Sequence, residues 1–283
     1  MRPEALEDAT GRARVHGGPD SGELARLGLR AADLLDFSVN VNPYGAAPGM
    51  LRAIHEARLD HYPDNHATAA RRALAAVWGV EPARICIGNG AAELLWALVP
   101  LCCRGGSLLV VEPTFVEPEL AARASGVPVH RHTTRLEDGF EIDVDAVAAK
   151  TRTTGARAIY LTSPQNPTGR LVPPTVTAQL ARAVGPGVTI LLDEAFLALS
   201  RAPEHAAVAL PETVVRIRSL TKEHALPGLR VGALMGPADL VAALADARPA
   251  WTVSAPALAA AEAAAAHEGF VAEIRARWLA DAD

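Results

Sequence analysis

The chain has 283 residues, 50% of them hydrophobic, and a formal net charge of −5. These values suit a globular protein with one large α/β domain and a smaller part, and they exclude a basic chain built to bind nucleic acid. The longest apolar run, Leu94 to Cys103, is about half as long as a membrane span, and the N-terminus lacks an apolar signal core. We therefore expect a cytoplasmic protein that binds neither nucleic acid nor a membrane.

Regular secondary structure is expected from about Thr68 onward, after a first part that glycine and proline interrupt. The pattern predicts helices at 68–78, from Ala92, at 117–124, 143–150, 238–247 and 255–267, and a last helical segment that reaches Asp283. It predicts strands at 84–87, 107–111, 128–132, 158–161, 189–192 and 214–216. Apolar strands that alternate with helices predict an α/β fold, in which a mostly parallel sheet is covered on both faces.

Three cysteines, Cys86, Cys102 and Cys103, are too few for a disulfide framework. They form no CxxC motif and no cluster with histidines, so we predict no metal site. All three are interpreted as small apolar core residues.

Polar residues follow each predicted strand, where an open parallel sheet binds its ligands. The first strand is followed by GNGAAE, Gly88 to Glu93, a glycine turn that opens a helix and suits a phosphate. Glu93 stands where a dinucleotide fingerprint has its third glycine, which argues against a nucleotide-binding Rossmann protein. An ordinary glycine-rich turn is the alternative for this segment.

Four more strand ends carry single candidates. Phe115 in EPTF can stack on a planar ring or pack in the core, and Asn166 in SPQNPTG can donate a hydrogen bond or belong to a plain turn. Asp193 in DEAF ends an apolar strand, where a carboxylate needs a cation or hydrogen bonds. The alternative is that Asp193 caps a helix and Glu194 is the first-turn charge of that helix. Lys222 in SLTK is reactive, or it is simply solvated with the neighbouring Glu223 as its ion partner.

Together these residues describe a single ligand, pyridoxal phosphate. A carboxylate keeps the pyridine nitrogen of this cofactor protonated, and a lysine holds its aldehyde as a Schiff base. Ser219, Thr221 and Arg230 would join the backbone amides of Ala91 and Ala92 on the phosphate, with Arg230 supplying positive charge.

The motifs NPTG, DEAF and SLTK resemble those of fold-type I pyridoxal-phosphate enzymes of the class I/II aminotransferase superfamily, and the similarity runs from about His16 to Pro256. The resemblance implies a three-layer α/β/α large domain with a mostly parallel sheet. It also implies roles: Lys222 as the Schiff-base lysine, Asp193 as the pyridinium partner, Asn166 as donor to the ring hydroxyl oxygen, and Phe115 as the stacking ring.

Within the superfamily the chain is most similar to the branch of histidinol-phosphate aminotransferases and cobalamin-pathway threonine-phosphate decarboxylases. HGG (16–18), DFSVNVNPYG (36–45) and YPD (62–64) carry this resemblance. It implies that His16, Gly17 and Asn42 bind substrate and that Tyr62 reaches the cofactor phosphate of a neighbouring subunit. A homodimer is therefore expected.

Two departures from the family pattern matter. Phe196 replaces a tyrosine that is usual in the aminotransferases, which favours the decarboxylase side. Family members also continue for roughly another domain, which supplies an arginine for the substrate carboxylate. We therefore expect an N-terminal segment at 1–50, the cofactor domain at 51–250, and only the start of an interdomain helix and C-terminal small domain at 251–283.

The leading hypothesis is a decarboxylase that acts on an amino acid phosphate, with L-threonine-O-3-phosphate as substrate. The alternative is a histidinol-phosphate-type aminotransferase that passes the amino group to 2-oxoglutarate. Both use the same cofactor residues, and the outcome depends on which bond to Cα stands perpendicular to the ring. A cofactor-binding but inactive protein is the third possibility.

Overall fold

The computed structural model describes residues 17–282, which form two compact units with the division between Val41 and Asn42. The smaller unit holds α1 (Ser21–Leu27) and a 3-10 turn, η1 (Ala31–Asp33). The Asp20 side chain caps α1 by accepting a hydrogen bond from the backbone N–H of Glu23 at 2.7 Å. The predicted domain boundaries at residues 50 and 250 stay predictions.

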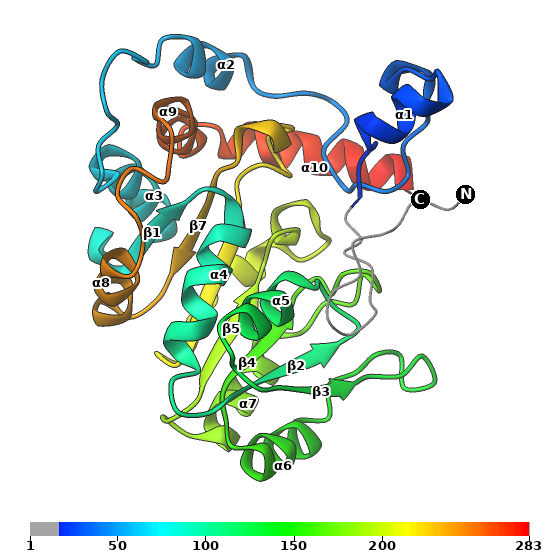
Figure 1. The fold of residues 1–283 in the computed structure, drawn as a ribbon, viewed down its shortest axis with the longest axis vertical. Coiled ribbons are helices and arrows are strands. Elements are labelled where there is room, and N and C mark those ends of the chain that lie inside the picture. Colours follow the sequence, from blue (N-terminus) through cyan, green and yellow to red (C-terminus); the bar gives the residue numbers. More distant parts are fainter. Residues whose placement is uncertain (1–16, 283) are drawn as a thin grey trace. The chain divides into compact units, whose positions relative to one another are not determined.

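The larger unit is built on a seven-stranded sheet with the order β1-β7-β6-β5-β4-β2-β3 (Figure 1). The strands are β1 (Ile85–Gly88), β2 (Ser107–Glu112), β3 (Val129–Thr133), β4 (Ala156–Thr162), β5 (Thr189–Asp193), β6 (Val214–Ser219) and β7 (Gly232–Met235). Strands β2 to β6 are parallel to their neighbours among themselves, whereas β7 runs antiparallel to both β1 and β6. The mostly parallel sheet that the sequence predicts is confirmed.

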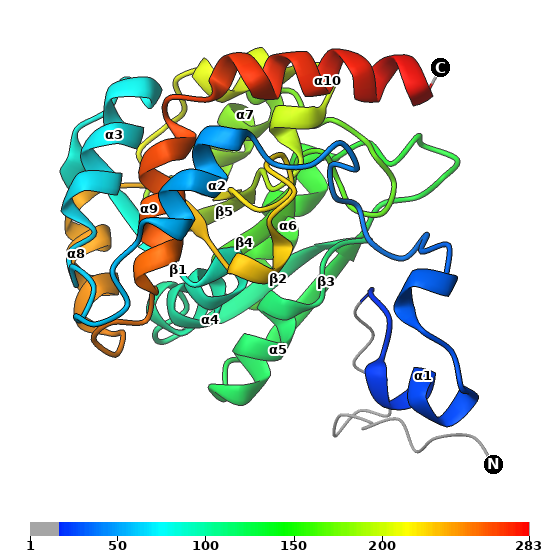
Figure 2. The same ribbon diagram turned by 90° about the horizontal axis from the view of Figure 1, so that it is seen from above.

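Helices cover both faces of this sheet, and Figure 2 shows α5 and α10 on opposite sides of it. The helices are α2 (Pro48–His55), α3 (Thr68–Trp78), α4 (Gly90–Cys102), α5 (Glu117–Ala124), α6 (Val144–Thr154), α7 (Pro174–Val184), α8 (Ala238–Asp246), α9 (Ala255–Ala264) and α10 (Glu268–Ala282). Within residues 17–282, no helix is long and apolar enough to cross a membrane. The cytoplasmic location stays a prediction.

Alternate residues of the central strands pack in two different hydrophobic cores. Leu108 of β2 and Tyr160 of β4 pack with α4, α5 and α8, whereas Leu109 and Ile159 pack with α6 and α7. Side chains of a strand point alternately to its two faces, so strands that are apolar throughout bury both faces. This burial accounts for the three-layer α/β/α arrangement.

Local signals set the ends of several helices. The Asp143 side chain caps α6 by accepting a hydrogen bond from the backbone of Ala146 at 2.9 Å. Helices α3 and α6 both end at a glycine in the left-handed region, Gly79 and Gly155, where residues with a Cβ are strained. These signals are local, which is why the sequence locates α3 and α5 at their observed bounds.

Three elements of the larger unit escape the sequence pattern: α2, α7 and β7. Both helices begin with a proline in the first turn and follow segments that the sequence shows as irregular. Strand β7 has only four residues, too few for a clear period. The helix expected from Ala92 begins earlier, at Gly90, so the whole glycine turn lies at its start.

Buried ion pairs brace the sheet beneath the ends of β5 and β6. The Glu194 carboxylate accepts hydrogen bonds from Arg216 at 2.6 Å and from Arg218 at 3.2 Å, and all three side chains are largely buried. The alternative in which Glu194 is only the first-turn charge of a helix is therefore wrong. The two arginines also donate to backbone carbonyls of the following turn, η4 (Pro203–Ala207), and so fix it to the sheet.

Cys102 and Cys103 behave as small apolar residues, whereas the Cys86 sulfur accepts a hydrogen bond from Arg248 at 2.9 Å, so the apolar interpretation is wrong for Cys86. Cys86 and Cys103 are buried and Cys102 is partly buried, and all three thiols are free. Burial raises the pKa of Cys102 and of Cys103 to about 12, which keeps both thiols protonated and unreactive at neutral pH.

Gly232 permits a close approach between β7 and the start of α4. A Cβ at this position would lie 2.6 Å from the backbone nitrogen of Ala91 and 3.0 Å from the carbonyl oxygen of Arg218. Both neighbours are backbone atoms and cannot turn away. We expect Gly232→Ala to lower the free energy of unfolding by about 1–3 kcal/mol, as overpacking does.

Gly228→Ala is the matched control, because nothing lies within 4 Å of a Cβ there. Chemical denaturation of both variants measures the difference. Equal stabilities of the two variants would contradict the close approach.

Candidate active site

The end of β1, the end of β6 and the start of β7 meet at the N-terminus of α4. In the sheet, Gly232 pairs with Gly88 on one side and with Ser219 on the other. The contact of Gly232 with Ala91 then joins these strand ends to the first turn of α4. The first turn of a helix has backbone N–H groups without intrahelical partners, and these attract an anion.

Hydroxyl groups and a guanidinium surround this helix start. The side-chain oxygens of Ser219 and Thr221 lie 2.8 Å apart, and both residues are buried. A Cβ on Gly90 would lie 2.5 Å from a terminal nitrogen of Arg230, so the guanidinium lies directly over the helix start. Ser219, Thr221, Arg230, Ala91 and Ala92 are thus brought together, as the phosphate prediction requires.

Asp193 lies at the end of β5 with 5% of its surface exposed. One carboxylate oxygen accepts a hydrogen bond from the Tyr160 hydroxyl at 2.8 Å, and the other accepts one from the backbone N–H of Ala195 at 2.9 Å. Burial nevertheless raises the pKa of Asp193, against the lowering effects of these hydrogen bonds and of Lys222. A further cation near this carboxylate would stabilise its charged form.

Tyr160 is a site residue that the sequence analysis does not identify. It lies on β4, is fully buried, and holds the orientation of the Asp193 carboxylate through its hydroxyl group. Burial, followed by the charge of Asp193, raises the pKa of Tyr160 well above its usual value, so the hydroxyl keeps its proton. The available signal is a tyrosine in an otherwise apolar strand, since a buried hydroxyl needs a partner.

Lys222 follows β6 and is partly buried. Burial lowers the pKa of its amine, Arg230 lowers it further, and Asp193 opposes both effects. A larger share of neutral amine at neutral pH suits a nucleophile or a general base. The amine lies 5.9 Å from the centre of the Phe196 ring, which presents no hydroxyl to it.

Asn42 ties a distant segment to the lysine. Its backbone N–H donates to the carbonyl of Lys222 at 3.0 Å, and its side-chain amide donates to the carbonyls of Glu223 at 2.8 Å and Gly45 at 3.1 Å. The amide oxygen accepts from the backbone of Tyr44 at 2.7 Å. Both amide hydrogens therefore bind backbone carbonyls, which gives Asn42 a positioning function. Its predicted contact with substrate stays a prediction.

Asn166 and Phe115 follow β4 and β2, on neighbouring strands of the sheet. The backbone N–H of Asn166 donates to the hydroxyl of Thr162 at 3.4 Å, and the residue is partly exposed. Phe115 is also partly exposed and packs against the core that α4 and α5 share. Both residues lie at the carboxyl edge of the parallel strands, where Asp193 and Lys222 also lie.

The remaining candidates lie elsewhere or outside the described residues. Tyr62 is 80% exposed and stacks on Trp251, with ring centroids 4.5 Å apart. Gly17 belongs to the smaller unit, and His16 lies outside the described residues. The roles of these three residues stay predictions.

The sequence matches a family model over residues 32–283, and that model describes aminotransferases of class I and II. The chain belongs to this family. Histidinol-phosphate aminotransferase 1 from Thiobacillus denitrificans is 35% identical over 259 residues, which are 88% of this chain and 66% of that protein. This aminotransferase chain thus spans about two thirds of the length of that relative.

Solved structures extend the likeness. Histidinol-phosphate aminotransferase from Sinorhizobium meliloti, in complex with pyridoxal-5'-phosphate, superposes with a TM-score of 0.76 at 26% identity over 84% of this chain and 65% of that one. L-threonine-O-3-phosphate decarboxylase from Porphyromonas gingivalis gives a TM-score of 0.67 at 25% identity, over 81% of this chain and 71% of that one. The predicted class I/II superfamily and α/β fold are confirmed.

The residues of this aminotransferase chain fit pyridoxal phosphate. The hydroxyl pair, Arg230 and the start of α4 suit a phosphate, and the absence of a Cβ at Gly90 leaves room for Arg230 there. The buried Asp193 suits a protonated ring nitrogen, and Lys222 has the lowered pKa that a Schiff-base lysine needs.

We expect Asn42→Ala to weaken cofactor binding about tenfold and to destabilise the protein by roughly 1–3 kcal/mol, because the carbonyls of Glu223 and Gly45 lose their donor. Titration of the apoprotein with pyridoxal phosphate, followed by visible absorbance, measures the affinity. Asn40→Ala is the control, since Asn40 is exposed. If the two variants bind the cofactor equally well, the positioning function of Asn42 is wrong.

Proposed function

We propose that this chain belongs to a pyridoxal-phosphate-dependent aminotransferase of the histidinol-phosphate type. It would move an amino group between a phosphorylated amine substrate and 2-oxoglutarate. The observation that carries the proposal is that Lys222, an amine with a lowered pKa, lies close enough to the buried Asp193 for their charges to interact, near a helix start that suits an anion. The name of the Thiobacillus denitrificans relative favours a histidinol-phosphate aminotransferase reaction over the decarboxylase reaction that the sequence alone suggests.

The bound cofactor supplies an electron sink for the bond that breaks at the substrate Cα. Asp193 would hold the proton on the ring nitrogen, and Tyr160 orients that carboxylate through its hydrogen bond. The Lys222 amine would hold the aldehyde of the cofactor, and its lowered pKa suits it to accept and return a proton at the substrate Cα as general base and acid. Asn166 would donate a hydrogen bond to the ring oxygen, and Phe115 would restrain the ring by stacking.

The proposed protein acts as a homodimer on a small phosphorylated amine. Tyr62 supports this proposal because its ring is largely exposed and stacks on Trp251. An exposed ring that is held in place in this way suits a contact with a second subunit. His16, Gly17 and the positioning residue Asn42 are the candidates for contact with the substrate.

Decarboxylation of an amino acid phosphate is the second candidate. It is favoured by Phe196, which places an aromatic ring without a hydroxyl 5.9 Å from the Lys222 amine, and by the likeness to the Porphyromonas gingivalis decarboxylase. The two reactions share every cofactor contact and differ in the bond held perpendicular to the ring.

The test supplies the full-length protein with histidinol phosphate and 2-oxoglutarate, and separately with O-phosphothreonine. We expect glutamate to form only in the first mixture. Lys222→Ala should lower the rate by about 10²–10⁴-fold, since it removes the general base, and should abolish the visible absorbance of lysine-bound pyridoxal. Release of carbon dioxide from O-phosphothreonine, without consumption of an oxo acid, would overturn the proposal in favour of the decarboxylase.

A further inference from the structure

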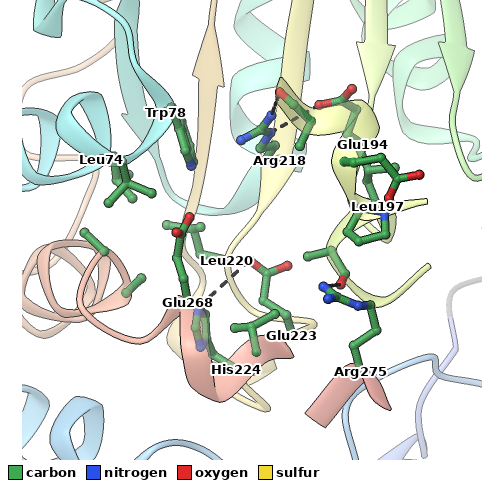
Figure 3. Close-up of a pocket in the computed structure, with 18 residues that line it drawn as sticks. Leu74, Trp78, Glu194, Leu197, Arg218, Leu220, Glu223, His224, Glu268 and Arg275 are labelled. Atoms are coloured by element: carbon green, nitrogen blue, oxygen red, sulfur yellow. Dashed lines mark hydrogen bonds and ion pairs between the residues drawn. The ribbon is translucent and has the colours of Figure 1, made fainter. Parts of the chain in front are cut away.

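A cavity of about 430 Å³ lies within the larger unit (Figure 3). Its walls come from α3, from the segment after β5, from the end of β6 with the residues beyond it, and from α9 and α10. Most lining side chains are apolar, among them Leu74, Trp78, Leu197, Leu220 and Val271. The cavity is therefore large enough, and apolar enough, for a small organic molecule.

None of the cofactor residues lines this cavity. Lys222, Asp193, Ser219 and Arg230 are absent from its walls, although Glu194 and Glu223 directly follow two of them in the chain. The cavity is thus separate from the cofactor site and goes beyond the proposed function.

The cations of the cavity are already engaged. Arg218 donates to Glu194 at 3.2 Å and lies over the Trp78 ring, 4.6 Å from its centre. Arg275 donates to the carbonyl of Ala198 at 3.3 Å. Arg218 shares Glu194 with Arg216, and the other charged wall residues are Glu204, Glu223, Glu268 and Arg275.

Glu223 is a carboxyl group of the wall that a cation would stabilise. Its side chain is 14% exposed, and the Nε2 atom of His224 lies 3.9 Å from its carboxylate. Burial raises the pKa of Glu223 to about 8, and Arg218 opposes that rise only in part. The sequence suggests Glu223 as an ion partner of Lys222, but within residues 17–282 no such pair is found.

His224 provides a second, independent sign of a missing ligand. The residue is 2% exposed, lines the cavity, and its Nδ1 atom has no hydrogen-bond partner among the described residues. Burial and the neighbouring His267 lower the pKa of His224 to about 4, so the ring is neutral. A buried ring nitrogen without a partner is costly, and a polar ligand group would satisfy it.

We propose that this cavity binds a small organic ammonium ion with an apolar body. The cation would neutralise Glu223, a polar hydrogen of the ligand or an intervening water would reach His224, and the body would pack against Leu74, Leu220 and Val271. Glu268, Glu204 and Arg275 are the other charged groups at the wall, and the two glutamates reinforce the preference for a cation.

The test uses benzyltrimethylammonium as probe and neopentylbenzene as its neutral isostere. The probe keeps its charge at every pH and cannot react with the cofactor aldehyde. Calorimetry with the cofactor-loaded protein at pH 8 should show that the cation binds at least about tenfold more tightly than the isostere. Binding should persist in Lys222→Ala, which separates this site from the proposed function.

Glu223→Gln should reduce the affinity for the probe about tenfold or more and leave the affinity for the isostere unchanged. Glu81→Gln, an exposed carboxyl outside the cavity, is the matched control. Absence of probe binding, equal affinity for the two molecules, or an unchanged affinity in Glu223→Gln would each overturn the proposal.

Proton release tests the same site without a substitution. In the empty cavity Glu223 is protonated at pH 7, because its pKa lies at about 8. A bound cation favours the carboxylate, so binding at pH 7 should release a proton, and affinity should rise between pH 6 and pH 8. Calorimetry in buffers of different ionisation enthalpy measures the release, and binding with no proton released would contradict a contact with Glu223.

Discussion

Burial of the Asp193 carboxylate is the constraint on which the candidate site depends. A buried carboxylate at the end of a strand is unfavourable unless hydrogen bonds and a cation offset the loss of its hydrating water. Tyr160 and Ala195 supply the hydrogen bonds, yet the pKa of Asp193 remains above its usual value. The protein thus holds a carboxyl group that is best stabilised by a positively charged partner, and a protonated pyridine nitrogen is such a partner. Lys222 contributes to the same balance, and its own pKa falls because Arg230 and burial oppose its charge.

The sequence predicts the parts of the fold that have a clear local pattern. Helices α3 and α5 have the expected bounds, because apolar spacing and helix-ending residues act within a few positions. The residues after each strand also point to the correct edge of the sheet, since parallel topology alone brings strand ends together. Strand β7 was not predictable in this way, because its four residues gain their structure from pairing with β1 and β6.

The limits of the sequence are clearest for charged and polar side chains in the interior. Glutamate is usually a surface residue, so the sequence does not show that Glu194 is buried. Only the folded chain brings Arg216 and Arg218 to it, from 22 and 24 positions away. The positioning function of Asn42 is likewise absent from the local pattern, because its amide donates to the carbonyl of Glu223, 181 positions away. Contacts of this separation depend on topology, which local patterns do not contain.

Strand β7 runs antiparallel to β6, and this reversal constrains the two ends of the loop that carries Lys222. Ser219 and Gly232 are paired neighbours in the sheet, so residues 220–231 form a loop whose two ends are fixed to each other. A shift of β7 by one position relative to β6, from an inserted or deleted residue that the loop does not absorb, would turn its side chains to the opposite faces of the sheet. The glycine at the close approach to α4 would then be replaced by a residue with a Cβ. The paired strand ends therefore fix the two points from which the loop presents Thr221, Lys222 and Arg230.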